Sequence, residues 1–299
     1  MSPAPRKLPL HTWFGLAILV LAEIMLSRGN RTVATWFTPI MWTGYILTAD
    51  GLVCRLVGHS WLWSRRREFP FLLLASVGVW LLFEAYNLHL RNWFYAAVPP
   101  NPVLRDFAYF WSFATIMPGV FETSELIAGL ILRRPLLEYG AVSSAPASPS
   151  KAWIPLGVGM ALLPLLLPAP IATYLFGLVW IGFILLLDPI NARIGAPSLM
   201  ASWRQGNRRP TLCLLAGGLA CGFLWETWNY QAFLAGGAYW VYTFPQALRP
   251  FGWHFGQMPV LGLLGFPPFA LELFAFYALA RKLLGLERFL SARATSPCG

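Results

Sequence analysis

Two glutamates, each followed three residues later by an asparagine, are the side chains best suited to acid–base chemistry. They are Glu84 with Asn87 and Glu226 with Asn229, and each pair lies in a long apolar segment. An ionisable side chain in a membrane span costs about 2.5–3.5 kcal/mol on insertion scales, so one that persists there is a candidate for function. At i+3 on a helix, the amide shares a face with the carboxyl group and can donate to it. A glutamic acid kept neutral by burial can protonate an alkene.

A second acidic set lies in apolar segments that contain prolines. Glu122 and Glu125 follow Pro118, and Glu272 follows Pro267 and an adjacent proline. Proline removes a backbone donor and kinks a helix, which frees carbonyl groups that must then be satisfied inside the protein. Glu122 and Glu125 share a helix face, and two carboxyls so close in a low dielectric do not both ionise readily. We therefore predict that one is a neutral acid or proton carrier; the alternative is a pair satisfied by the kinked backbone.

Several classes of site are excluded. The chain has no P-loop, dinucleotide glycine fingerprint, G-x-S-x-G elbow or H-E-x-x-H motif, and its four histidines are scattered. No aspartate-rich motif for magnesium–diphosphate chemistry occurs, so we expect no metal and no cofactor. The cysteines show no C-x-x-C spacing and lie in or beside apolar segments, which favours buried thiols over disulfides. They are Cys54, Cys213, Cys221 and Cys298.

The composition indicates which kind of secondary structure positions these residues. The chain has 299 residues, of which 57% are hydrophobic and 11% charged, and its mean hydropathy is +0.58. These values indicate an all-α, polytopic membrane protein. At about 20 residues per span, eight helices use about 160 residues and leave no room for a sizeable soluble domain. The partners expected are membrane lipids and an apolar small molecule.

The chain also repeats itself. A first set of motifs recurs in the same order in the second half, which indicates two tandem four-helix units. The matching pairs are Trp42–Asp50 with Trp180–Asp188, Phe83–Asn87 with Trp225–Asn229, Trp93–Tyr95 with Trp240–Tyr242, and Met117–Pro118 with Met258–Pro259.

Apolar runs predict four helices in each unit, joined by a flexible linker. We expect the first repeat at 1–134, a flexible cytoplasmic linker at 135–152 and the second repeat at 153–299. The linker is small, polar and proline-containing, so little compensates for the entropy lost on ordering it. The predicted helices are 13–27, 34–50, 70–89, 107–132, 153–167, 170–188, 210–230 and 255–282.

Basic residues indicate the orientation. Of 22 Lys and Arg residues, 17 fall in the termini and alternate loops and five in the opposite loops. Lys and Arg stay on the cytoplasmic side, so both termini are predicted to be cytoplasmic in the cell membrane. The formal charge of +10 is thereby explained without a nucleic-acid partner. An even number of spans per repeat relates the halves by an axis along the membrane normal, with a shared, water-poor site between them.

Two further features have structural interpretations. Asp50 and Asp188 are predicted to end the second helix of each repeat, Asp188 with Pro189 as a helix stop, and to serve structure at the membrane boundary. The abundant aromatic residues, 16% of the chain, are expected chiefly in an interfacial belt. A lined pocket, in which ring faces stabilise a cation, is the alternative.

Three functions remain open. The first is a membrane enzyme that isomerises or cyclises an isoprenoid-like substrate by acid–base chemistry, without a metal. In architecture the chain resembles the small integral-membrane lycopene and terpene cyclases, although the Pro-x-Glu-Glu element of lycopene cyclases is absent. The second is a proton-coupled transporter with its site between two pseudo-symmetric halves. The third is a non-catalytic membrane assembly subunit.

Overall fold

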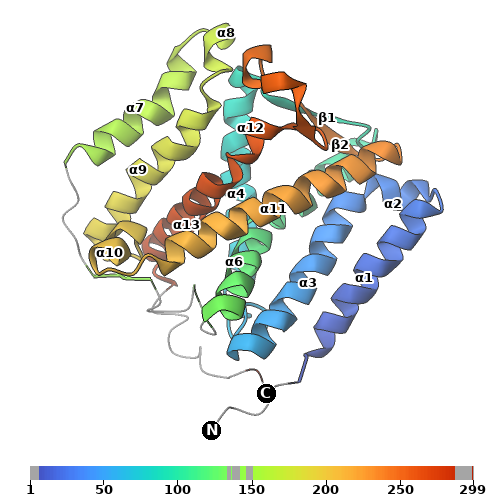
Figure 1. Ribbon diagram of the computed structural model, residues 1–299, viewed down its shortest axis with the longest axis horizontal. Coiled ribbons are helices and arrows are strands. Elements are labelled where there is room, and N and C mark those ends of the chain that lie inside the picture. The colour runs from blue at the N-terminus through green and yellow to red at the C-terminus, as the bar shows by residue number, and fades with distance from the viewer. Residues whose placement is uncertain (1–6, 133–135, 137–141, 146–150, 287–297, 299) are drawn as a thin grey trace.

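Helices follow one another through almost all of the described chain. The computed structural model describes residues 7–132, 136, 142–145, 151–286 and 298, and it is 72% helical (Figure 1). The first group of elements is α1 (Leu10–Ser27), α2 (Arg31–Thr35), α3 (Phe37–Val57), α4 (Phe69–Leu90), β1 (Trp93–Ala96), α5 (Pro102–Ala114) and α6 (Ile116–Leu132). The second is α7 (Trp153–Leu166), α8 (Ala169–Ala172), α9 (Phe176–Ile194), α10 (Leu199–Arg204), α11 (Arg209–Leu234) and β2 (Tyr239–Tyr242), then η1 (Gln246–Leu248), η2 (Pro250–Gly252), β3 (His254–Phe255), β4 (Met258–Pro259), α12 (Val260–Leu263) and α13 (Phe266–Leu283).

Seven helical segments among the described residues are long and apolar enough to cross a membrane. Two of these segments are broken helices, one running from Pro102 to Leu132 and one from Val260 to Leu283. The chain is therefore suited to be a multi-pass membrane protein. The segment missing from the eight predicted is α7, which is apolar but has only 14 residues. At 1.5 Å per residue it is about 21 Å long, short of the ~30 Å hydrocarbon layer.

Each group contains a tightly crossed helix pair. Helix α1 packs along α3, and α7 packs along α9 (Figure 1). At both crossings two glycines let the backbones approach closely. A Cβ on Gly15 would lie 2.6 Å from the Gly44 carbonyl oxygen, and a Cβ on Gly157 would lie 2.7 Å from that of Gly182.

The predicted ends of the second helices were wrong. Helix α3 continues beyond Asp50, and α9 passes through Pro189. The actual ends are left-handed glycines, Gly58 and Gly195, with φ of 88° and 67°, a backbone region that glycine adopts without a Cβ penalty. Each aspartate instead accepts hydrogen bonds from backbone amides about 12 residues further along the chain. This contact is structural, because it holds the segment that follows the helix against the helix end. The pairs are Leu62 N to Asp50 at 2.8 Å, and Leu199 N and Met200 N to Asp188, both at 2.8 Å.

The proline-containing segments are broken, as expected. The break between α5 and α6 falls at Thr115, and Pro118 lies in the first turn of α6, where a missing N–H disturbs no intrahelical bond. Ser76 of α4 satisfies backbone groups at this break: its hydroxyl donates to the Phe113 carbonyl and accepts from Met117 N at 2.9 Å.

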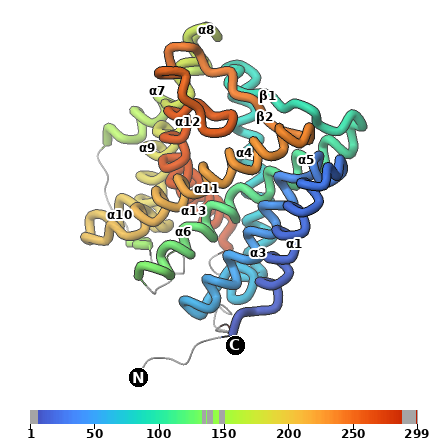
Figure 2. The backbone as a smooth tube through the Cα atoms, turned by 45° about the vertical axis from the view of Figure 1, so that its right-hand side comes forward, coloured from blue at the N-terminus to red at the C-terminus, as the bar shows by residue number. Residues whose placement is uncertain are grey.

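A short antiparallel ribbon joins the two groups of elements. Strand β1 lies beside β2 (Figure 2). In the pairing, Trp93 faces Tyr242, Phe94 faces Val241 and Tyr95 faces Trp240. A second two-stranded ribbon, β3 with β4, lies further along the chain. These two ribbons are the exception to the predicted all-α architecture within the described residues.

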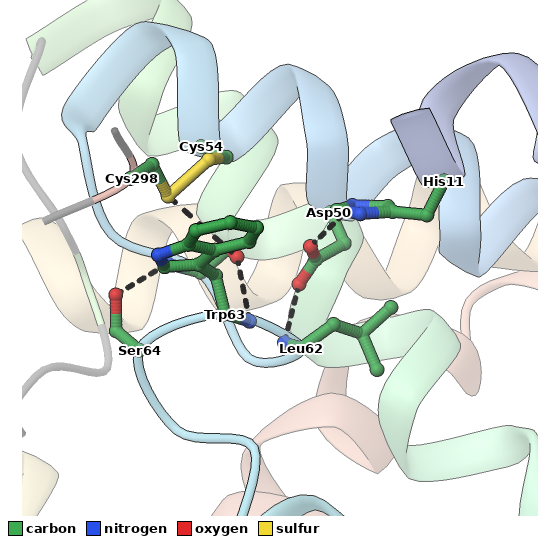
Figure 3. Close-up of a disulfide and its surroundings, with 8 residues drawn as sticks. His11, Asp50, Cys54, Leu62, Trp63, Ser64 and Cys298 are labelled. Carbon is green, nitrogen blue, oxygen red and sulfur yellow. Dashed lines mark hydrogen bonds and ion pairs between the residues drawn. A yellow bond between two sulfur atoms is a disulfide. The ribbon is translucent and has the colours of Figure 1, made fainter. Parts of the chain in front are cut away.

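The expectation of four free thiols was wrong. Cys54 at the end of α3 forms a disulfide with Cys298, with a Cα–Cα distance of 5.8 Å (Figure 3). Cys298 N also donates to the Gly58 carbonyl at 2.8 Å, so the chain returns to α3 over a separation of 244 residues. Local cysteine spacing carries no information about such a distant partner. Cys213 and Cys221 are free and buried.

The predicted flexible linker, 135–152, lies largely outside the described residues, and the domain boundaries stay a prediction. Within its described part, Ser143 N donates to Ser202 Oγ at 2.8 Å, and the Ser143 carbonyl accepts from Ser198 N at 2.9 Å.

Candidate functional site

An aromatic cavity lies where the two groups of elements meet. Its volume is about 130 Å³, and its wall is overwhelmingly apolar. More than half of its lining residues are aromatic, contributed by helices and strands from both groups. The aromatic lining residues include Trp42, Trp80, Trp93, Tyr95, Phe113, Trp180, Trp225, Trp240, Tyr242, Phe266 and Phe269.

Glu84 stands behind the wall on the side of α4 and β1. Its Oε1 atom accepts three hydrogen bonds, from Tyr95 OH at 2.6 Å, Trp80 Nε1 at 2.8 Å and Trp93 Nε1 at 3.1 Å. All three donors line the cavity, whereas Glu84 itself does not. The carboxyl group therefore fixes the polar edges of the rings and leaves their faces to the cavity.

Glu226 holds the equivalent place behind α11 and β2. Its Oε1 atom accepts from Tyr242 OH at 2.7 Å and from Trp240 Nε1 at 3.4 Å. The side chain is 0% exposed, whereas Glu84 is half-buried. Its Oε2 atom has no hydrogen-bond donor among the described residues. The ribbon thus brings the donors of the two glutamates side by side, because Tyr95 and Trp240 are cross-strand partners.

The two tyrosines are neutral proton donors. Burial and the neighbouring Glu84 raise the pKa of Tyr95 well above its usual value. Burial and Glu226 do the same for the pKa of Tyr242. Near neutral pH each phenol therefore keeps its proton and directs it at a carboxyl oxygen. A tyrosine backed by a glutamate can pass a proton in either direction between the cavity and the carboxyl group.

The predicted asparagines hold the strands. Asn87 donates to the Trp93 carbonyl at 2.8 Å and accepts from Asn92 N at 2.8 Å. Asn229 donates to the Trp240 carbonyl at 3.0 Å and accepts from Trp240 N at 2.9 Å. Their hydrogen bonds thus go to backbone groups in or beside the two strands. By fixing Trp93 and Trp240, they position the donors that the glutamates use.

The two sides of the cavity differ. On the α4 side the Trp80 ring fills the position that Gly222 occupies on α11. A Cβ on Gly222 would lie 2.5 Å from a ring carbon of Phe266, and one on Gly218 would lie 2.4 Å from the Phe266 carbonyl oxygen. The small residues of α11 therefore admit Phe266 to the wall, whereas the first group supplies a tryptophan.

The second acidic set lies away from this cavity. Glu122, Glu125 and Glu272 are buried, and none of them lines it. Glu125 accepts from Leu136 N at 2.6 Å, while the polar neighbour of Glu122 is the carboxyl group of Asp50. The oxygens of Glu272 receive no hydrogen bond from described residues. The predicted acidic residues thus occupy several separate places.

Tyr95 and Tyr242 were absent from the sequence-based candidates, although they touch the cavity directly. The signal was available: Trp-x-Tyr occurs in both halves, at 93–95 and 240–242. Residues two apart on a strand point to the same face. The prediction of an interfacial belt left this shared face unrecognised. The alternative prediction, an aromatic-lined pocket, describes these residues.

Comparison of the chain with protein-family models, with curated proteins and with solved structures finds no match. Within the described ranges, no group of three or more His, Cys, Asp or Glu side chains is placed to hold a metal ion. Function must therefore be inferred from the geometry of the site.

Proposed function

We propose that this protein is a membrane enzyme that isomerises or cyclises an isoprenoid-like, lipid-soluble substrate by acid–base chemistry in the aromatic cavity. One observation carries the proposal: two tyrosine hydroxyls on the wall, Tyr95 and Tyr242, are each backed by a glutamate, at 2.6 and 2.7 Å. An apolar wall selects an apolar substrate. The hydroxyl–carboxyl pairs supply the proton transfers.

The two pairs suit opposite roles. Three donors converge on Glu84, which stabilises a carboxylate. Glu226 is fully buried and leaves Oε2 without a donor among the described residues, which suits a protonated acid. In the first step the hydrogen bond between Tyr242 and Glu226 reverses: Glu226 gives its proton to the Tyr242 oxygen as Tyr242 gives its own proton to an alkene carbon of the substrate. The alkene electron pair forms the new C–H bond and leaves a carbocation.

The second step restores a neutral product. A carbon next to the cationic centre of the substrate loses a proton to Tyr95 Oη. The cation that loses it is either still open-chain or already cyclised. The electrons of the broken C–H bond form the new alkene, and Tyr95 passes its own proton to Glu84. Between the steps, the ring faces of Trp80, Trp93 and their neighbours stabilise the cation. A dry wall also keeps water from capturing it.

We further propose the architecture of two tandem four-helix repeats with eight spans and cytoplasmic termini. Helix α7 supplies the eighth span, together with α8. Support comes from pairs of equivalent features: the glycine crossings of α1 with α3 and of α7 with α9, the glycine ends of α3 and α9, and the amide-binding aspartates. The ribbon adds a further pair, since Trp93 faces Tyr242 and Tyr95 faces Trp240.

Comparative lipid profiling tests the activity. Extracts from cells with and without the intact chain should differ by a rearranged apolar product of unchanged mass. Tyr242→Phe and Glu226→Gln should each reduce that product by about 10²-fold or more, the scale of general acid–base catalysis. Tyr230→Phe is the matched control, because Tyr230 lies one turn from Glu226 on α11 and is 41% exposed. Its product yield should equal that of the wild type.

Identical lipid profiles, or full activity in both Tyr242→Phe and Glu226→Gln, would contradict the enzymatic proposal. Proton-dependent uptake by liposomes containing the chain would then favour a transporter. The observation in favour of that second candidate is that both broken helices, α5–α6 and α12–α13, adjoin the cavity. Broken helices at a shared site are typical of transporters built from repeats.

A further inference from the structure

A second polar site lies away from the aromatic cavity, where α1, α3 and α6 meet. Asp50 of α3 and Glu122 of α6 are both 0% exposed, and their carboxyl groups lie close enough together to interact. Neither oxygen of Glu122 receives a hydrogen bond from any N–H or hydroxyl group of the described residues. Two buried carboxylates close together repel each other. A hydrogen bond between the two carboxyl groups therefore requires a proton shared between them.

His11 connects this pair to the surface of the protein. It lies in the first turn of α1, and its Nε2 atom is 2.9 Å from Asp50 Oδ2 (Figure 3). Its side chain is 23% exposed, whereas that of Asp50 is fully buried. The other oxygen of Asp50 is fixed by Leu62 N at 2.8 Å. Asp50 is therefore held between a histidine that reaches the surface and a glutamate that does not.

We propose that His11, Asp50 and Glu122 form a proton-binding site, filled from the end of the molecule where α1 begins. In the filling step the imidazolium of His11 gives its Nε2 proton to Asp50 Oδ2. The N–H bond breaks, an O–H bond forms, and the imidazole returns to neutral. The proton is then shared between Asp50 and Glu122. This site is independent of the reaction proposed for the aromatic cavity.

The surroundings favour a proton over a metal ion. His11, Asp50 and Glu122 are not arranged as a metal-binding group, and no such group of three or more His, Cys, Asp or Glu side chains occurs in the part of the chain that the structure describes. Arg65 lies near Glu122, but its guanidinium is bound to Glu68 through two hydrogen bonds of 3.0 and 2.9 Å. The other titratable groups that interact with Glu122 are Tyr45 of α3, Arg65 before α4 and Glu125 of α6.

Infrared spectroscopy of the purified full chain in detergent tests the site directly. At neutral pH the wild type should show a carboxylic-acid C=O band that shifts on transfer to D2O. Glu122→Gln should remove this band, and Asp50→Asn should shift it by replacing the hydrogen-bonding partner. Glu272→Gln is the matched control, since Glu272 is also 0% exposed and lacks a donor among described residues. It should remove a different band.

His11 tests the route. In His11→Phe the deuterium exchange of the Glu122 band should slow by about 10²-fold or more, the scale on which a positioned acid–base group accelerates proton transfer, while the Glu272 band exchanges at its wild-type rate. A spectrum unchanged by Glu122→Gln would overturn the site, and unchanged exchange in His11→Phe would overturn the route. Because His11 reaches the surface, its substitution remains informative even if Glu122→Gln does not fold. A wild-type chain that forms no rearranged product but shows the Glu122 band would instead count against the cavity chemistry alone.

Discussion

Glu68 is a buried charge whose partners come from distant parts of the chain. It is 3% exposed and receives two hydrogen bonds from Arg65, a contact of 3.1 Å from Arg281 Nε, and a hydrogen bond from Tyr277. Arg65 in turn lies over the Trp61 ring, 3.3 Å from its centroid. This cluster ties the segment before α4 to α13, far along the sequence.

Glu68→Gln should lower the stability of the protein by about 3–5 kcal/mol, because it leaves two buried arginines without their carboxylate. The matched control is Asp106→Asn, whose partner Arg105 is 3.7 Å away across an exposed surface. An exposed pair contributes about 1 kcal/mol or less. Thermal unfolding of both variants in detergent measures the difference, and equal shifts would contradict the role given to the cluster.

The same cluster predicts a pH dependence. Burial alone would raise the pKa of Glu68, but Arg65, Arg281 and the Tyr277 hydroxyl outweigh it and lower the pKa. A lowered pKa means that the fold favours the carboxylate. Its stabilisation is complete above the ordinary value of about 4.3 and is lost as the pH falls through the lower value in the folded protein. The unfolding temperature of the wild type should therefore drop in acid more steeply than that of Glu68→Gln.

At the scale of the elements, paired glycines determine how closely the helices cross. A Cβ on Gly157 of α7 would lie 2.5 Å from Leu186 N, whereas one on Gly159 would meet no atom within 4 Å. Gly157→Ala should therefore force α7 and α9 apart and cost about 1–3 kcal/mol. Gly159→Ala should be neutral or stabilise by up to about 1 kcal/mol through helix propensity. Similar unfolding temperatures for the two variants would contradict the close crossing.

The elements themselves could largely be predicted, because long apolar runs report directly on spans. The helix predicted at 210–230 is present at Arg209–Leu234, and that at 70–89 is present at Phe69–Leu90. The end of α9 was predicted wrongly because Pro189 was read as a stop. In the structure Pro189 is accommodated inside the helix, where packing overrides local preference.

The candidate site was harder to predict, because it depends on how strands and loops return to the helices. Glu84 and Glu226 stood out as acids in apolar segments, and the structure places them behind one cavity. Their tyrosine partners lie 11 and 16 residues further on, beyond the reach of any helical spacing rule. The neighbours Asp50 and Glu122 come from different helices, and periodicity within one helix cannot bring them together.

At the scale of the whole molecule, the β1–β2 ribbon fastens the two groups of elements across the cavity. One of its two inner pairs is Phe94 with Val241. Opposite Cα atoms in such a pair lie about 4.5–5.5 Å apart, within the range a disulfide needs. Phe94→Cys with Val241→Cys, in a chain without its native cysteines, should therefore cross-link under mild oxidation.

Phe94→Cys with Tyr239→Cys is the out-of-register control, because Tyr239 faces Ala96. It should cross-link far more slowly. Digestion between the two sites, followed by gel electrophoresis with and without reductant, distinguishes the two results. Equal yields would show that the register is not fixed, and the two tyrosines would then lack defined positions on the cavity wall.

The redox state of the Cys54–Cys298 disulfide indicates on which side of the membrane this end of the molecule lies. Disulfides persist in oxidising compartments and are rare in the cytosol, whereas the distribution of Lys and Arg predicts a cytosolic position for this end of the molecule. The two criteria therefore give opposite answers for the same end. In intact cells, a closed bridge means that α1 begins in an oxidising space, and alkylation of Cys54 and Cys298 themselves means that it begins in the cytosol.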